Sequence, residues 1–302
     1  MNLGLPHLVD PRLLPLVEDS RAFYANRTPG RGPGSLVELR AIRAQLVAPT
    51  ASQPPPAEEL VSVDGRTVAL RIHTPADRPP TGVILEIHGG GFYLGSAASS
   101  DIRNRALADA LGVTVASVDY RLAPEHPWPA APEDCETAAL WLAEHAEDRF
   151  GTSKVAIVGF SAGATLAINT LLRLRDQGVS AVDTAVLQFG TYDLSAQTPA
   201  GRLIADEYFL EAYAGSVPDR TRPDLSPIYA DLKNLPPVLM IVGDRDILLQ
   251  DNLAMAAGLS ADGVDVDLRV YPEAAHGFTG HPTPMAGAAL ADIGAWLSGY
   301  LG

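Results

Sequence analysis

Short apolar runs alternate with longer segments of helical periodicity along most of this chain. The runs rich in Val, Ile and Leu predict strands at residues 61–73, 82–88, 113–118, 154–158, 185–189, 238–242 and 267–271. Apolar residues three or four positions apart predict helices at residues 99–111, 131–144, 165–177, 252–261 and 285–301. This alternation predicts right-handed crossovers and an α/β fold, with a mainly parallel central sheet flanked by helices.

Two segments depart from the alternation. Residues 1–50 contain helical pieces with apolar residues at positions 13, 14, 16 and 17 and at positions 36, 39, 42 and 46. Residues 195–224 interrupt the later strands and helices with aromatic and apolar residues of helical type. We expect residues 51–302 to form the main α/β domain. Residues 1–50 are expected to form an N-terminal helical cap segment, and residues 195–224 to add to this cap over the strand ends.

A glycine-flanked serine ends one of the predicted strands. Gly159 and Gly163 lie two residues on either side of Ser161, between an apolar run and a predicted helix. The G-x-S-x-G spacing holds a serine in a strained strand-to-helix turn, where larger flanking side chains would collide. This turn lifts the hydroxyl above the sheet edge, so the pattern predicts that Ser161 is a nucleophile.

A serine nucleophile needs a base to take its proton and a carboxylate to orient that base. Asp246 follows a strongly apolar predicted strand, and Asp244 beside it is the competing candidate. His276 lies in the loop after the next predicted strand, and His281 is the alternative base, interpreted as a surface loop residue. Each candidate therefore lies after the carboxyl end of a strand.

The oxyanion that forms when a carbonyl is attacked needs hydrogen-bond donors. His88 is followed by three glycines at the end of a predicted strand, and glycines leave backbone N–H groups accessible to a substrate oxygen. The expected donors are the amides of Gly90, Gly91 and Ala162. A tight glycine-rich turn without a binding role is the alternative interpretation.

Aromatic residues near these candidates could line an apolar substrate cleft. Phe92 and Tyr93 follow the three glycines, and Tyr192 follows a predicted strand. Tyr208 and Phe209 belong to the 195–224 insertion. Simple core packing is the alternative for each of them. Glu207 and Glu211 of the same insertion are interpreted as a solvated helix face.

The composition limits the partners, disulfides and metal sites that we expect. The formal net charge of −14 disfavours nucleic acid as a partner, because phosphates would be repelled. A single cysteine, Cys135, excludes an intramolecular disulfide and a site of several thiolates, and its helical context predicts a core residue. Paired histidines at metal-ligand spacing are lacking, and the remaining histidines (His7, His73, His126 and His145) are interpreted as surface or packing residues, so we expect no metal.

Two features bear on membranes and location. Residues 155–172 carry no charge, but their embedded polar residues and the serine turn favour a buried strand and helix over a membrane span. The N-terminus lacks a cationic start followed by an apolar stretch, so we expect no secretory signal and a cytoplasmic location.

With these motifs together, the chain resembles the hormone-sensitive-lipase-like branch of the α/β-hydrolases, the bacterial family IV esterases. The order Ser161, Asp246, His276 is the α/β-hydrolase order. The long motif from Tyr120 to Pro127, followed by Pro129 and Ala130, is a hallmark of this branch, and the resemblance extends from about residue 60 to residue 301.

This resemblance implies a carboxylic ester hydrolase with no cofactor, a preference for short acyl chains, a helical cap and assembly into homodimers. By position it implies Ser161 as nucleophile, Asp246 as acid, His276 as base and Gly90, Gly91 and Ala162 as oxyanion donors. The expected substrate is a small ester with a short-to-medium acyl group. Two positions depart from the family pattern: Phe160 replaces a polar residue and Ala164 replaces a glycine.

Other functions are compatible with a fold that carries Ser161, Asp246 and His276. An amidase, arylformamidase or peptidase could use the same three residues, because amide cleavage differs mainly in protonation of the leaving group. A small-molecule receptor on this fold is the less favoured alternative, since such receptors have typically lost the histidine that is present here as His276. A scaffolding protein would have no need of all three residues.

Overall fold

The computed structural model describes residues 4–25, 27, 32–47 and 49–302. Within these residues an eight-stranded sheet has the order β1-β2-β4-β3-β5-β6-β7-β8. Its strands are β1 Ala57–Val63, β2 Arg66–His73, β3 Val83–Ile87, β4 Thr114–Asp119, β5 Val155–Phe160, β6 Thr184–Gln188, β7 Val238–Gly243 and β8 Val266–Tyr271. All neighbours from β4 to β8 pair in parallel, whereas β2 is antiparallel to both β1 and β4. The predicted, mainly parallel α/β sheet is confirmed.

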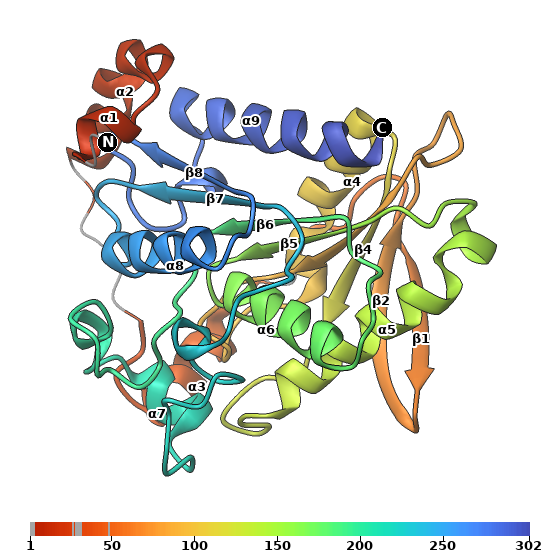
Figure 1. Cartoon of the computed structure of the whole chain (residues 1–302), viewed down its shortest axis with the longest axis horizontal. Coiled ribbons are helices and arrows are strands. Elements are labelled where there is room, and N and C mark those ends of the chain that lie inside the picture. Colours follow the sequence, from red (N-terminus) through yellow and green to blue (C-terminus); the bar gives the residue numbers. More distant parts are fainter. Residues whose placement is uncertain (1–3, 26, 28–31, 48) are drawn as a thin grey trace.

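Helices cover both faces of the sheet (Figure 1). One face carries α4 (Asp101–Leu111) and α9 (Pro284–Leu301), and the other carries α5 (Ala130–Phe150), α6 (Ala162–Asp176) and α8 (Leu249–Ala261). The strands β3, β5, β6 and β7 are buried and mostly apolar on both faces, as expected of parallel strands between two helical layers. Each face of the sheet therefore has its own hydrophobic core.

The prediction of one strand over residues 61–73 is wrong, because this segment belongs to a hairpin. Asp64 and Gly65 both have positive φ, 50° and 78°, and join β1 to β2 with Val63 opposite Arg66. An Asp-Gly pair is a strong signal for such a two-residue turn, since both positions need positive φ. The apolar residues on either side concealed that signal.

The N-terminal segment and the 195–224 insertion lie beyond the carboxyl ends of the parallel strands, of which β6, β7 and β8 point to the left in Figure 1. The N-terminal segment forms α1 (Leu5–Leu8), a 3-10 turn at Pro11–Leu16, α2 (Val17–Ala25) and α3 (Leu36–Gln45). The insertion forms a 3-10 turn at Gly201–Ile204 and helix α7 (Tyr208–Ala214). Their helical character agrees with the sequence pattern, although part of residues 1–50 lies outside the described residues.

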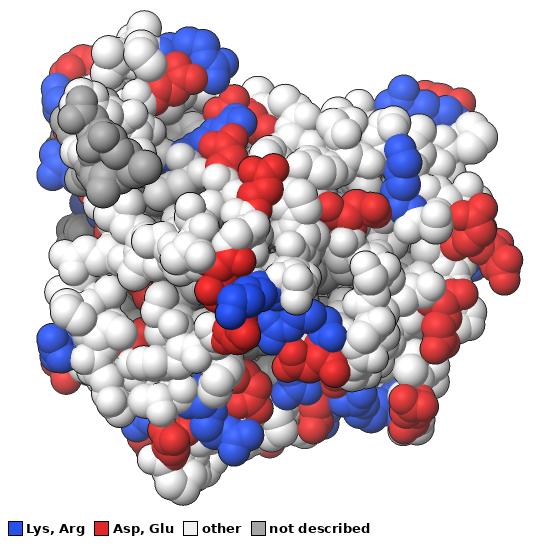
Figure 2. Space-filling model, viewed as in Figure 1, with Lys and Arg blue, Asp and Glu red and all other residues white. Residues whose placement is uncertain are grey.

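Charged side chains of both signs are interspersed over the face drawn in Figure 2. On that face Lys and Arg lie beside Asp and Glu and do not gather into one broad basic field. No helix within the described ranges combines the length and the apolar character needed to cross a bilayer.

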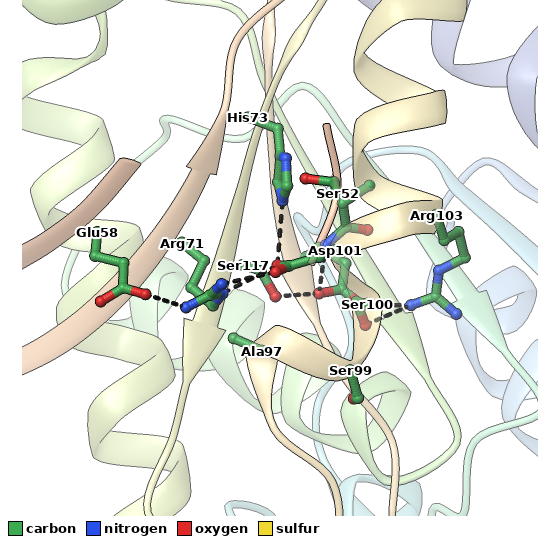
Figure 3. Close-up of polar contacts among 12 residues, drawn as sticks. Ser52, Glu58, Arg71, His73, Ala97, Ser99, Ser100, Asp101, Arg103 and Ser117 are labelled. Atoms are coloured by element: carbon green, nitrogen blue, oxygen red, sulfur yellow. Dashed lines mark hydrogen bonds and ion pairs between the residues drawn. The ribbon is translucent and has the colours of Figure 1, made fainter. Parts of the chain in front are cut away.

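A buried polar cluster ties the hairpin to the start of α4 (Figure 3). Arg71 of β2 donates from Nε to Asp101 Oδ1 (2.9 Å) and from Nη2 to Asp101 Oδ2 (2.6 Å), and it also contacts Glu58 of β1. His73 Nε2 lies 3.4 Å from Asp101 Oδ1, and burial lowers the pKa of this histidine. Asp101 is almost fully buried, so its carboxylate depends on these partners.

We expect Asp101→Ala to lower the free energy of unfolding by about 3 kcal/mol, because it leaves the Arg71 guanidinium partly buried without its main partner. Chemical denaturation monitored by circular dichroism measures this change. The control is Asp176→Ala, which removes an exposed carboxylate paired with Arg175 and should cost less than about 1 kcal/mol. Equal effects of the two substitutions would contradict the role given to Asp101.

Candidate active site

Ser161 occupies the sharp turn between β5 and α6. Its backbone has φ 54° and ψ −120°, outside the regions that most residues adopt. A Cβ on Gly159 would lie 2.3 Å from the Gly163 carbonyl oxygen, and one on Gly163 would lie 2.0 Å from the Ile87 carbonyl oxygen. The two glycines are therefore required by the close approach of α6 to β5 and β3, which is the reason for the observed spacing.

The structure brings Ser161, His276 and Asp246 into one hydrogen-bonded chain. Ser161 Oγ lies 2.8 Å from His276 Nε2, and His276 Nδ1 lies 2.9 Å and 3.1 Å from the two carboxylate oxygens of Asp246. Because an ionised carboxylate only accepts hydrogen bonds, Nδ1 is the protonated nitrogen. The lone pair of Nε2 is then free to accept the proton of Ser161.

Asp246 is held by its own strand end. Its side chain is fully buried, and Oδ1 also accepts a hydrogen bond from the Leu248 N–H (2.8 Å). The competing residue, Asp244, is half-buried and makes no hydrogen bond to either histidine among the described residues. Burial raises the pKa of Asp244. Of the two aspartates, Asp246 is thus the one placed against His276.

The glycine loop after β3 packs directly against the serine turn. A Cβ on Gly89 would lie 2.7 Å from the Phe160 carbonyl oxygen and 3.3 Å from Ser161 Cβ. Gly90 and Gly91 have φ values of 123° and 59°, which favour glycine. Among the described residues, the amides of Gly90, Gly91 and Ala162 donate no hydrogen bond to the protein. These N–H groups are available to an oxygen of a bound molecule.

A cavity of about 1180 Å³ opens above Ser161. It is bounded by the glycine loop, the 195–224 insertion, α2 and the loops after β7 and β8. Its apolar wall includes Phe92, Ile204, Phe209, Ile247 and Leu248. Within the described residues, no group of three His, Cys, Asp or Glu side chains is placed to hold a metal ion.

Two of the five predicted aromatic residues, Phe92 and Phe209, line this cavity. Tyr93 and Tyr208 are not among its lining residues, and their ring centroids lie 6.3 Å apart. The expectation that Tyr192 lines the cavity is wrong. Its ring is fully buried in the core beneath Gly190, and its backbone N–H donates to Asp251 Oδ2 (2.5 Å).

Sequence reasoning missed several residues of the polar wall. His281, expected at the surface, is half-buried, lines the cavity and lies 2.7 Å from the Tyr24 hydroxyl through Nδ1. Burial lowers the pKa of His281. Glu207 also lines the cavity, whereas Glu211 is exposed as expected. These positions depend on how α2 and the insertion dock, for which the local sequence pattern holds no signal.

Comparisons with known proteins agree with this geometry. A family model described as alpha/beta hydrolase fold matches residues 84–280. The chain belongs to the hormone-sensitive-lipase-like branch of this family.

Several relatives similar to this chain carry the names of ester hydrolases. It is 32% identical to a carboxylic ester hydrolase, LipN, of Mycobacterium tuberculosis, over 89% of this chain and 77% of the relative. It is 31% identical to an ethyl acetate hydrolase of Pseudomonas putida, over 86% of this chain and 91% of the relative. An esterase structure from Pyrobaculum calidifontis superposes with a TM-score of 0.79 and 29% identity, covering 96% of this chain and 98% of that one.

The two departures from the family pattern are structurally accommodated. Phe160 packs edge-to-face on Phe189 with centroids 4.7 Å apart, and Phe189 in turn lies 5.1 Å from the His276 ring. Ala164 is fully buried, and its Cα would lie 2.5 Å from a Cβ placed on Gly159. An apolar contact therefore occupies the place of a polar group beneath the histidine.

We expect Gly163→Ala to reduce stability by about 3 kcal/mol and to abolish most activity, because the new methyl group collides with backbone that cannot move aside. Thermal unfolding and initial rates on an activated ester measure the two effects. Gly287→Ala is the control, since its Cβ would meet nothing within 4 Å in α9. A fully active, equally stable Gly163→Ala protein would show that the close approach is not required.

Proposed function

We propose that this protein is a serine carboxylesterase that hydrolyses short-to-medium acyl esters through an acyl-enzyme intermediate. The observation that carries the proposal is the hydrogen-bonded chain of Ser161, His276 and Asp246, with Ser161 open to the cavity. The esterase names of relatives along most of the chain support the class of reaction. No cofactor is needed for this chemistry.

In the first half of the cycle, Ser161 Oγ attacks the ester carbonyl carbon while His276 Nε2 takes the hydroxyl proton. The carbonyl oxygen becomes an oxyanion held by the amides of Gly90, Gly91 and Ala162. Asp246 keeps the imidazole in the required tautomer and stabilises its charged form. Collapse of the intermediate breaks the bond to the alcohol, which leaves with the proton from His276.

In the second half, His276 takes a proton from a water molecule, and the resulting hydroxide attacks the acyl carbon. The second oxyanion collapses, the acid leaves, and Ser161 recovers its proton. The apolar wall with Phe92 and Phe209 suits the hydrocarbon part of the ester. Its relatives include proteins named ethyl acetate hydrolase and arylesterase, which supports small esters as substrates.

Hydrogen bonding between Ser161 and His276 favours an enzyme over a non-catalytic receptor. Ester and amide hydrolysis need the same three residues, so a matched ester and anilide of one acyl group separate the carboxylesterase from an amidase. The homodimer and the cytoplasmic location expected from the sequence remain predictions.

We expect Ser161→Ala to lower kcat by about 10⁶-fold, because no other group at the site can form the acyl-enzyme. The assay is the initial rate on p-nitrophenyl esters from acetate to palmitate, where wild-type rates should be highest for short-to-medium chains. Fluorophosphonate labelling of wild type, lost in the variant, is the control for the nucleophile. Undiminished hydrolysis by Ser161→Ala would rule out this mechanism.

We expect Asp246→Asn to lower kcat by about 10⁴-fold while leaving the fold intact, because the amide favours the wrong imidazole tautomer. Steady-state kinetics on p-nitrophenyl butyrate measure the loss. Asp244→Asn is the matched control two residues away and should retain activity close to wild type. If Asp244→Asn were the more damaging substitution, the assignment of the acid would have to be exchanged.

A further inference from the structure

The glycine loop after β3 (residues 88–95), called the oxyanion loop because it carries proposed oxyanion donors, has a positive φ angle at a residue other than glycine. Gly90, Gly91 and Phe92 are three consecutive residues with positive φ, and Phe92 at 63° is not a glycine. A non-glycine residue in this region costs about 1–2 kcal/mol, so surrounding contacts must hold it there. The loop carries two of the proposed oxyanion donors, and its exact shape therefore matters for turnover.

Contacts from α7 of the insertion and from the loop after β4 hold the first part of this loop. The Phe92 ring stacks on Tyr213 with centroids 4.0 Å apart and planes 7° from parallel. The Ala123 N–H donates to the Phe92 carbonyl (2.9 Å), and the Leu94 N–H donates to the Gly90 carbonyl (2.8 Å). The carbonyl of Tyr93, by contrast, is held by the N-terminal segment.

Arg43 of α3 supplies that contact. Its Nε and Nη2 donate to the Tyr93 carbonyl (3.0 and 2.7 Å), and Nη2 also donates to the Ala123 carbonyl (2.6 Å). Its Nη1 lies 2.8 Å from both carboxylate oxygens of Glu125, which fixes the plane of the guanidinium. The same contact is the main reason that the pKa of Glu125 is lowered.

One side chain from the N-terminal segment thus joins the oxyanion loop to the loop that contains Ala123 and Glu125. Only a planar fork with several donors can reach both carbonyls and the carboxylate at once. The arginine side chain is mostly buried, with 24% of its surface exposed, so water is a poor substitute for these bonds.

We infer that Arg43 is a positioning residue for catalysis: by bridging the Tyr93 and Ala123 carbonyls it sets the oxyanion loop and makes turnover depend on the docking of α3. This inference rests on the proposed function. A purely structural role, in which Arg43 only anchors α3, is the alternative to be separated from it.

The test replaces Arg43 and measures oxyanion binding apart from overall stability. Arg43→Met keeps the length of the side chain without donors. Arg43→Lys keeps the charge but has one nitrogen in place of three, so it cannot hold both carbonyls and the Glu125 carboxylate at once. Arg40→Met, an exposed position on the same helix, is the control. Each variant is assayed for kcat and KM on p-nitrophenyl butyrate and for inhibition by an alkyl trifluoromethyl ketone, whose serine adduct carries an oxyanion. The matching trifluoromethyl carbinol, which forms no adduct, serves as a second inhibitor.

We expect Arg43→Met and Arg43→Lys to lower kcat by about 10- to 100-fold, somewhat less than loss of an entire oxyanion donor, with KM changed by less than about 3-fold. Inhibition by the ketone should weaken by a similar factor, inhibition by the carbinol should not change, and Arg40→Met should behave as wild type.

An unchanged kcat in both Arg43 variants would overturn the inference, as would equal weakening of ketone and carbinol. If Arg43→Met does not fold, Glu125→Gln is used instead, because it weakens the contact that orients the guanidinium. We expect a smaller loss of kcat and of ketone inhibition, with carbinol inhibition unchanged. Wild-type values of kcat and ketone inhibition in Glu125→Gln would also overturn the inference. An inactive wild type or an active Ser161→Ala variant would instead contradict the proposed function, so the two failures are distinguishable.

Discussion

The site depends on direct contact between backbones at the ends of β3 and β5. The Cα of Gly163 lies against the Ile87 carbonyl, and Gly89 lies against the carbonyl of Phe160, with no room for a Cβ at either place. These two contacts bring the serine turn and the glycine loop, which come from neighbouring parallel strands, within reach of one substrate carbonyl. Everything else at the site is arranged around this pair, because a shift of either strand end would separate the nucleophile from the oxyanion donors.

The parallel sheet supplies the remaining parts at the same edge. Asp246 follows β7 and His276 follows β8, so consecutive strand ends deliver the carboxylate and the imidazole to the serine. Burial then sets the character of each group: Asp246 is enclosed with its hydrogen-bond donors, whereas the His276 side chain retains 38% exposure toward the cavity. A carboxylate that is fully satisfied orients the imidazole, and an imidazole that is partly exposed can exchange protons with substrate and water.

The sequence was sufficient for the sheet, the serine turn and the order of the three polar residues, since each has a local signal: an apolar run, a glycine spacing, a polar residue after a strand. It was insufficient wherever a side chain could turn to either side of its backbone. Tyr192 and Phe209 are both aromatic residues near the site, yet the Tyr192 ring is buried in the core and Phe209 lines the cavity. His281 and Glu207 reach the cavity only because α2 and the insertion dock there. Arg43 and Arg40 lie in the same amphipathic helix, and nothing local distinguishes the one that bonds the loop.

The N-terminal segment contacts both loops that carry the proposed chemistry. The Ser20 hydroxyl of α2 donates to the Glu273 carbonyl (2.6 Å), and the Tyr24 hydroxyl is hydrogen-bonded to His281. Helix α2 therefore contacts the chain on both sides of His276. Arg43 of α3 donates to the Tyr93 carbonyl in the loop that contains Gly90 and Gly91. Without these contacts, the two loops would make the same hydrogen bonds only with water. The N-terminal segment therefore restricts the motion of the loops that carry His276 and the proposed oxyanion donors. Helix α2 therefore both lines the cavity and holds the loop of His276, so a movement of α2 that widens the cavity would also break its bonds to that loop.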